Sequence, residues 1–186
     1  MSDGLVFISR KDAMSGQQHW SDIVFQLALE QGITNVSFVP DAGLSPLIKL
    51  CEESSQINVV RLTSEDEGVS LALGSWLGGV KSLLLMQSSG VGNCINMLSM
   101  LNTCQIPLPM IVTMRGDWGE FNPWQVPMGQ GTEGVLREMG VTVFKAQKSE
   151  EVPECAEGAI RLAFNTFRAT AVLVGQRVLG AKTFGK

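Results

Sequence analysis

Three carboxylates stand together in the sequence Ser64-Glu65-Asp66-Glu67, directly after an apolar segment. Ser64 followed three positions later by Glu67 is a capping box, which gives Glu67 a structural task at the start of a helix. Glu65 follows the predicted cap, next to a strand end, so its side chain can point into a cleft at the edge of a sheet. A purely electrostatic role near the helix N-terminus is the alternative. Glu65 is therefore the first candidate for proton chemistry in this sequence.

A second polar segment, Ser88-Ser89-Gly90-Val91-Gly92-Asn93, has the features of an anion cradle. It follows a predicted strand and opens a helix, where free backbone N–H groups and the helix dipole favour negative charge. It is neither a Walker loop nor a dinucleotide fingerprint, because the glycine and lysine spacings of those motifs are absent. A tight turn that needs glycine is the alternative.

Several other residues have both a chemical and a structural interpretation. Asp41 follows the first predicted strand and is either a ligand contact or a turn residue. Cys94 falls in the first turn of a predicted helix, where it is either a thiol with a lowered pKa or a small packing residue. Trp118 and Trp124 suit a subunit interface or a lid over a cleft, with core packing as the alternative.

The candidates are positioned by alternating strands and helices. Strands are predicted at 36–39, 57–62, 82–86, 109–114, 141–144 and 171–174. The first helix is predicted to follow a capping pattern at Ser15 and Gln18 and to end at Gly32. Further helices are predicted at 45–51, 64–77 and 149–167. Two more follow predicted loops: one runs from the loop at 87–90 to residue 104, and one from a long loop at 115–131 to residue 139. Continuous apolar strands are typical of a parallel sheet that is covered on both faces. The predicted fold class is α/β, a three-layer parallel six-stranded sheet with helices on both faces and ligands at the carboxyl ends of the strands.

Composition excludes several classes of protein. The 186 residues are 45% hydrophobic, which excludes a disordered chain, and no run of about 18 apolar residues is long enough to span a membrane. The net charge is −4 and no Lys/Arg cluster stands out, so nucleic-acid binding is not expected. Four cysteines without CxxC spacing and a single histidine, His19, predict neither a metal site nor Cys–His catalysis. With no signal peptide at the N-terminus, we expect a cytoplasmic protein with reduced thiols.

Four motifs, in order along the chain, resemble the thiamine-diphosphate-dependent phosphonopyruvate and sulfopyruvate decarboxylases. They are Val39-Pro40-Asp41, the helix from Glu65 to Gly74, the segment from Met86 to Asn93, and Arg115 to Glu120 with Gln125 to Gly129. The resemblance is closest to the alpha subunit of the sulfopyruvate decarboxylases, which is a pyrimidine-binding (PYR) domain. It implies a PYR domain over 17–178, an N-terminal extension over 1–16 and a tail over 179–186 that has little to pack against.

The resemblance also implies roles for individual residues. The family has a catalytic glutamate that hydrogen-bonds N1′ of the cofactor's aminopyrimidine ring nine positions before a glycine, and Gly74 minus nine is Glu65. Ser89, Gly90 and Asn93 join Glu65 as implied cofactor contacts, although many relatives have Gly-Pro-Gly in place of Ser88-Ser89-Gly90. The active-site histidines of pyruvate-type decarboxylases are missing, and the polar side chains left to contact the substrate are Asp41, Gln87, Ser88, Arg115 and Gln125.

Half of the expected cofactor site is missing from this sequence. In this superfamily the diphosphate and Mg²⁺ are held by a Gly-Asp-Gly motif and an asparagine about 25 to 30 residues later. Gly116-Asp117 is not followed by a third glycine, and no asparagine stands near position 144. The resemblance therefore implies a separate diphosphate-binding (PP) beta subunit that holds most of the thiamine diphosphate and Mg²⁺, with the active site at the subunit interface.

The implied reaction is the decarboxylation of 3-sulfopyruvate, a small 2-oxo acid, to sulfoacetaldehyde and CO2. A sulfonate needs N–H donors or a guanidinium fork, so Arg115 and the 88–93 segment are candidates to bind it. Pairing of Arg115 with Asp117 or Glu120 is the alternative. A phosphonopyruvate decarboxylase-like subunit and a non-catalytic anion-binding or regulatory α/β module also stay open, as do the subunit count and the choice between sulfonate breakdown and coenzyme synthesis.

Overall fold

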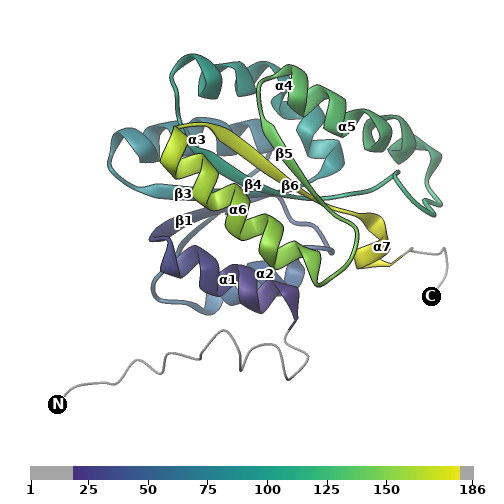
Figure 1. Ribbon diagram of the computed structural model, residues 1–186, viewed down its shortest axis with the longest axis horizontal. Coiled ribbons are helices and arrows are strands. Elements are labelled where there is room, and N and C mark those ends of the chain that lie inside the picture. Colours follow the sequence, from purple (N-terminus) through teal and green to yellow (C-terminus); the bar gives the residue numbers. More distant parts are fainter. Residues whose placement is uncertain (1–18, 181–186) are drawn as a thin grey trace.

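A six-stranded sheet forms the centre of the molecule, of which the computed structural model describes residues 19–180. Its strands are β1 (Ile33–Phe38), β2 (Asn58–Arg61), β3 (Lys81–Gln87), β4 (Leu108–Thr113), β5 (Thr142–Ala146) and β6 (Ala169–Val174). Every neighbouring pair is parallel, in the order β2-β1-β3-β4-β6-β5 (Figure 1). The predicted α/β fold with a parallel six-stranded sheet is thus confirmed.

Helices cover both faces of this sheet. They are α1 (Trp20–Glu30), α2 (Ser45–Glu53), α3 (Glu65–Leu77), α4 (Ser88–Thr103), α5 (Val126–Glu138), α6 (Glu151–Thr166) and α7 (Gln176–Leu179), with a short 3₁₀ helix η1 (Pro123–Gln125). The first core cluster joins α1, α2 and α6 to one face, and the second joins α3, α4 and α5 to the other. Figure 1 shows α1 and α2 on the lower side of the sheet and α4 and α5 on the upper side.

The central strand β3 shows why the strands read as continuous apolar runs. Leu83 and Leu85 belong to the first core cluster, whereas Leu84 and Met86 belong to the second, and all four are fully buried. Side chains alternate between the two faces of a strand, so a sheet that is covered on both faces needs apolar residues at every position. Each such side chain stabilises the fold by about 1.5 to 3 kcal/mol.

The predicted loop over 87–90 is wrong, because α4 begins directly after β3 at Ser88. The Ser88 hydroxyl is fully buried and joins the ends of two neighbouring strands. It accepts a hydrogen bond from the Arg115 backbone N–H at 3.0 Å and donates one to the Arg115 carbonyl at 3.3 Å. This link lets the helix start without a connecting loop.

The predicted long loop over 115–131 is also too long, since η1 and α5 follow it from Pro123 onwards. Glycine disfavours a helix interior by about 1 kcal/mol, and Gly129 and Gly131 concealed the first turns of α5 in the sequence. Gly129 is required by packing rather than by a turn. A Cβ atom there would lie 2.0 Å from the carbonyl oxygen of Arg115.

The described part of the chain begins just before α1 and ends just after α7. The capping pattern predicted at Ser15 and Gln18 lies outside the described residues, and α1 begins at Trp20 with His19 as its N-cap. Leu179, which was expected to lie in a tail with little to pack against, is partly buried against the first core cluster. Within residues 19–180, no helix has the length and apolarity that crossing a membrane requires.

Candidate active site

The side chains of Asp41 and Gln87 meet at the carboxyl ends of β1 and β3, where the two following connections pass to opposite faces of the sheet. The segment after β1 leads to α2 on one face, whereas β3 leads to α4 on the other face. In open parallel sheets such a switch point is the usual ligand crevice. Asp41 follows β1 and Gln87 ends β3, and Gln87 Nε2 donates to Asp41 Oδ1 at 2.8 Å. Two predicted substrate contacts are therefore brought together at this point.

The Asp41 carboxylate is held by three donors. Besides Gln87, it accepts hydrogen bonds at Oδ2 from the Gly43 backbone N–H at 2.9 Å and from Thr113 Oγ1 at 2.8 Å. Thr113 is the last residue of β4 and was not singled out from the sequence. Only the strand order points to Thr113. Strand β3 lies between β1 and β4, so the carboxyl ends of all three strands meet at one edge of the sheet.

These hydrogen bonds also fix the orientation of the Gln87 side-chain amide. A carboxylate can only accept, so the Gln87 amide must present its nitrogen to Asp41 and its oxygen to the other side. Ser89 Oγ donates to that oxygen, Gln87 Oε1, at 2.8 Å. The hydroxyl proton of Ser89 is thereby committed to Gln87. Ser89 can offer only its lone pairs to a ligand, so it suits an N–H or O–H group of a ligand rather than an anion.

Glu65 is the first residue of α3 and is 7% exposed. Glu67 forms the predicted capping box, since its carboxylate accepts from the backbone N–H groups of Thr63 at 2.9 Å and Ser64 at 3.4 Å. This frees Glu65 to face the neighbouring helix. Asn93 Nδ2 donates to Glu65 Oε2 at 2.8 Å, and within residues 19–180 no donor reaches the other oxygen.

The Glu65 side chain packs directly against the backbone of Gly90 in α4. A Cβ atom on Gly90 would stand 2.3 Å from both the carboxyl carbon and Oε1 of Glu65. Real atoms never approach so closely, so Gly90 has to lack a side chain for Glu65 to occupy this position. The structure thus brings together Glu65, Gly90 and Asn93, three of the four residues expected to contact the cofactor, and Ser89 adjoins them in the chain.

The substitution Gly90→Ala is expected to lower the free energy of unfolding by about 1 to 3 kcal/mol, since Glu65 must move from its place. Alanine ordinarily stabilises a helix relative to glycine, so the sign of this change is diagnostic. Gly92→Ala is the matched control two residues further along α4. A Cβ atom there would meet only the flexible Met128 side chain, at 3.3 Å. Chemical denaturation of both variants checks the prediction, and equal effects would contradict it.

Arg115 is paired within its own loop. Its Nε and Nη2 atoms donate to the two carboxylate oxygens of Glu120 at 2.6 and 2.5 Å. The side chains are 13% and 2% exposed, so this is a largely buried ion pair. The hydrogen bonds from Arg115 lower the pKa of Glu120 to about 2. The alternative considered for Arg115, pairing with Glu120, is what the structure contains.

Gln176, a buried residue of α7, holds the same loop from the end of β6. Its Oε1 accepts from the backbone N–H groups of Gly116 at 3.1 Å and Trp118 at 3.3 Å, and its Nε2 donates to Glu120 Oε2 at 2.9 Å. Its backbone N–H donates to Asp117 Oδ1 at 3.2 Å, and burial raises the pKa of Asp117. Gln176 has no local signal in the sequence, because about 60 residues separate it from the loop that it holds.

Two further expected substrate contacts occupy different surroundings. Ser88 is fully buried and its hydroxyl is committed to the Arg115 backbone, so it lies behind the site and holds the chain after β4 rather than facing a ligand. Gln125 follows the Arg115 loop, and its side-chain oxygen is buried with no hydrogen-bond partner among the residues that the structure describes. A buried unpaired amide oxygen is unfavourable by about 1 to 3 kcal/mol, which leaves Gln125 with unused hydrogen-bonding capacity.

Cys94 is a packing residue. It is fully buried in the second core cluster, and burial, reinforced by the nearby carboxylates of Glu65 and Asp66, raises its pKa to about 12. The lowered pKa considered from its place in the helix is therefore wrong, because desolvation of the thiolate outweighs the helix dipole.

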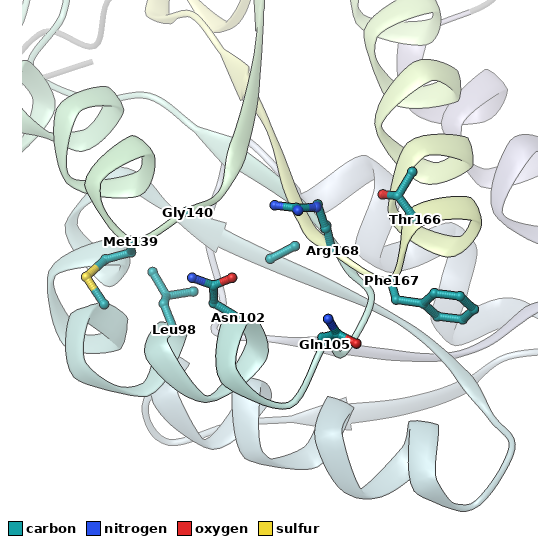
Figure 2. Close-up of a pocket in the computed structure, with 9 residues that line it drawn as sticks. Leu98, Asn102, Gln105, Met139, Gly140, Thr166, Phe167 and Arg168 are labelled. Carbon is teal, nitrogen blue, oxygen red and sulfur yellow. The ribbon is translucent and has the colours of Figure 1, made fainter.

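A small cavity lies at the opposite edge of the sheet, between the C-terminal ends of α4, α5 and α6 (Figure 2). Its volume is about 70 Å³, and Asn102, Arg168 and Met139 are among the residues that line it. Pockets for cofactors and drug-sized ligands measure roughly 300 to 1,000 Å³. This cavity is too small for such a ligand, and the carboxyl edge of the strands is the better candidate site.

Comparison with known proteins places the chain among decarboxylases. A sulfopyruvate decarboxylase subunit alpha from Methanococcus maripaludis is 33% identical over 155 residues, which are 83% of this chain and 93% of the relative. The sulfopyruvate decarboxylase of Methanosarcina acetivorans is 34% identical over 156 residues, which are 83% of this chain but only 40% of that protein. A phosphonopyruvate decarboxylase from Streptomyces viridochromogenes is 39% identical over 107 residues, 56% of this chain and 27% of that protein.

The solved structures agree on the fold. A 2-oxoglutarate:ferredoxin oxidoreductase from Magnetococcus marinus, with 2-oxoglutarate, coenzyme A and succinyl-CoA bound, superposes with a TM-score of 0.71 at 16% sequence identity. The superposition covers 87% of this chain and 29% of that chain. No protein-family model matches the chain. On the identity and coverage of its relatives, the chain belongs to the family of sulfopyruvate decarboxylase alpha subunits.

Proposed function

We propose that this chain is the pyrimidine-binding half of a thiamine-diphosphate-dependent decarboxylase that converts 3-sulfopyruvate to sulfoacetaldehyde and CO2. The other half is a separate diphosphate-binding beta subunit, and the active site lies between the two. The observation that carries this proposal is Glu65, a carboxyl group buried at the carboxyl edge of a parallel sheet with one oxygen held and the other unpartnered among residues 19–180.

The residues around Glu65 fit an aminopyrimidine ring. Asn93 holds Oε2, which leaves Oε1 for a ring nitrogen, and Gly90 gives the carboxyl group its place by lacking a side chain. Ser89, whose hydroxyl proton is committed to Gln87, presents lone pairs that suit an amino group. Thiamine diphosphate, when bound, supplies the carbanion chemistry that decarboxylation of a 2-oxo acid requires. With the ring bound, the carboxyl of Glu65 would hydrogen-bond its nitrogen through a shared proton.

The substrate contacts follow from the same edge of the sheet. Asp41 and Gln87, joined at the switch point, are proposed to contact the 2-oxo acid. Arg115 is proposed to bind the sulfonate with the N–H donors that Glu120 leaves unused, or with the whole guanidinium if it exchanges Glu120 for the substrate. Glu120 would then keep the donors Gln176 Nε2 and the backbone N–H groups of Gly116 and Asn122. Gln125 is proposed to add its side-chain amide oxygen, whereas Ser88 supports the site from behind through its hydrogen bonds to Arg115.

Relative lengths support a second half on another chain. This chain matches 93% of one alpha subunit but only 40% of the Methanosarcina acetivorans sulfopyruvate decarboxylase, which has a further three-fifths of unmatched sequence. We propose that the unmatched part corresponds to the beta subunit. Thiamine diphosphate and Mg²⁺ are assigned mainly to that subunit, because the Gly-Asp-Gly motif with its later asparagine is not found in this sequence.

Trp124 is expected to be a central contact with the beta subunit. It is 79% exposed on η1, beside the Arg115 loop at the carboxyl edge, and buried tryptophans dominate many interfaces. Trp124→Ala is expected to weaken the association of the two subunits by roughly thirtyfold, about 2 kcal/mol, in a calorimetric titration. Leu77→Ala is the matched control, since Leu77 is 75% exposed at the C-terminal end of α3. If Leu77→Ala weakened binding and Trp124→Ala did not, the proposed interface would lie at the wrong edge.

The identity of the substrate is tested by comparing 2-oxo acids. The tagged chain, purified with its native partner, would be given 3-sulfopyruvate, 3-phosphonopyruvate or pyruvate together with thiamine diphosphate and Mg²⁺. We expect kcat/KM for CO2 release to be at least tenfold higher with 3-sulfopyruvate. A preference for 3-phosphonopyruvate would replace the proposed substrate with the phosphonate alternative, which the Streptomyces viridochromogenes relative favours. If none of the three acids released CO2, the non-catalytic anion-binding module would replace the proposed enzyme.

A further inference from the structure

Thr113 reaches the candidate site only through Asp41. Its hydroxyl donates to Asp41 Oδ2 at 2.8 Å, and a weaker contact of 3.4 Å joins the same hydroxyl to the Met86 carbonyl. Thr113 is 1% exposed, so it does not itself meet a ligand from solvent. Its methyl group and the Asp41 carboxylate lie on the same side of Gly43. A Cβ atom on Gly43 would stand 3.1 Å from Thr113 Cγ2 and 2.9 Å from Asp41 Oδ2.

The donors to Asp41 come from three different parts of the fold. Gly43 belongs to the same turn as Asp41, Gln87 ends the neighbouring strand β3, and Thr113 ends β4 one strand further away. Gln87 pairs with Thr113 in the register of the two strands, so the sheet itself presents both donors at a set spacing. Two of the three donors are thus carried on strands, which hold a group more rigidly than a loop does.

We propose that Thr113 is a positioning residue, which holds the Asp41 carboxylate in the orientation that the decarboxylation needs. This inference rests on the proposed function and deepens it, since Asp41 is its proposed substrate contact. Without the Thr113 hydroxyl, Oδ2 keeps only the Gly43 N–H from its own turn, and the carboxylate is free to rotate about the Gln87 contact. Misplacement of a group at a reacting centre lowers the rate far more than it lowers binding.

The test compares Thr113→Val, which keeps the shape and removes the hydroxyl, with Thr113→Ser, which keeps the hydroxyl. Measured in the complex with its native partner, Thr113→Val is expected to lower kcat about tenfold with little change in KM, and Thr113→Ser to restore most of the loss. Thr170→Val is the matched control. Thr170 lies on the neighbouring strand β6 and is also fully buried. Its hydroxyl donates to the backbone carbonyl of Ala159 at 2.9 Å. Its substitution reports the general effect of removing a buried threonine hydroxyl.

Two further measurements separate positioning from a structural role and from failure of the proposed function. In an Asp41→Ala background, Thr113→Val is expected to cause no additional loss of kcat, because it acts through Asp41. Independently of activity, hydrogen exchange of the Gly43 amide in the complex is expected to accelerate severalfold in Thr113→Val and not in Thr113→Ser or Thr170→Val. Additive losses of kcat, no rescue by serine, or unchanged Gly43 exchange would each overturn the proposal. If the unmodified complex released no CO2 while Gly43 exchange changed as expected, the positioning of Asp41 would stand and the proposed reaction would fall.

Discussion

Replacing Glu65 with glutamine is expected to lower the turnover of the complex about a thousandfold. General acid–base groups contribute roughly 10² to 10⁴ to enzyme rates, and glutamine keeps the shape of the side chain while losing the exchangeable carboxyl proton. Asn93 can still hydrogen-bond to the new amide oxygen, and Gly90 leaves the same space. The fold and the assembly with the beta subunit should therefore survive, as size-exclusion chromatography and thermal melting would show.

Glu67→Gln is the matched control for this substitution. Glu67 stands in the same helical turn, but its carboxylate is used to cap α3 through Thr63 and Ser64. Its substitution is expected to lower stability slightly through loss of the cap, with turnover close to that of the unmodified protein. A Glu65→Gln variant with ordinary turnover, or two variants with equal losses of turnover, would remove Glu65 from the proposed mechanism.

Glu120→Gln is expected to lower the free energy of unfolding by about 3 kcal/mol. The substitution leaves the Arg115 guanidinium largely buried without its hydrogen-bonded counter-charge, and breaking one partner of a buried pair typically destabilises a protein by about 3 to 5 kcal/mol. For a chain of this size the melting temperature should fall by roughly 10 °C. The Gln176 amide, which donates to the same carboxylate, also loses a charged acceptor.

The pH dependence of this effect follows from the lowered pKa of Glu120. Hydrogen bonds from Arg115 lower that pKa from 4.5 to about 2 in the folded protein. The pair therefore stabilises fully above about pH 4.5, and its contribution, about 3 kcal/mol, is lost as the pH falls from 4.5 toward 2. Burial raises the pKa of Asp117, so this residue makes the protein more stable as the pH falls. The effect of Glu120 is therefore measured as the difference in unfolding free energy between the variant and the unmodified protein. The stability difference between the two proteins should shrink on acidification.

A surface pair provides the control for this second prediction. Glu133 pairs with Lys145 and Arg137, but its side chain is 33% exposed and both cations are about half exposed. Glu133→Gln is expected to change stability by less than about 1 kcal/mol. Similar losses in Glu120→Gln and Glu133→Gln, or a Glu120→Gln effect that did not shrink at low pH, would contradict the importance given to the buried pair.

Much of the fold could be predicted from the sequence because apolar periodicity reports burial directly. Leu83 to Met86 read as a strand buried on both faces, and that is how β3 packs. The errors lie where packing overrides local preference. The start of α4 depends on hydrogen bonds between the Ser88 hydroxyl and the backbone of Arg115, which lies 27 residues away just after β4. Helix α5 contains Gly129 because the Arg115 carbonyl lies against it. Neither contact has a local signal in the sequence.

The candidate site divides in the same way. Glu65 was identified from a capping box and from the spacing to Gly74 that the family resemblance implies, and both features lie within one helix. Thr113 and Gln176 were missed, because each acts on a residue more than 50 positions away. The partner of Arg115 could be narrowed only to Asp117 or Glu120, since both stand within reach in the sequence and only the fold of the loop selects Glu120.

The most direct single measurement is CO2 release from 3-sulfopyruvate with thiamine diphosphate and Mg²⁺, made on the tagged chain alone and on the same chain recovered with its native partner. A site divided between two subunits predicts release by the complex and none by the chain alone. Release by the chain alone would contradict the division of the active site. No release by a complex that has bound its partner and the cofactor would contradict the sulfopyruvate decarboxylase activity itself.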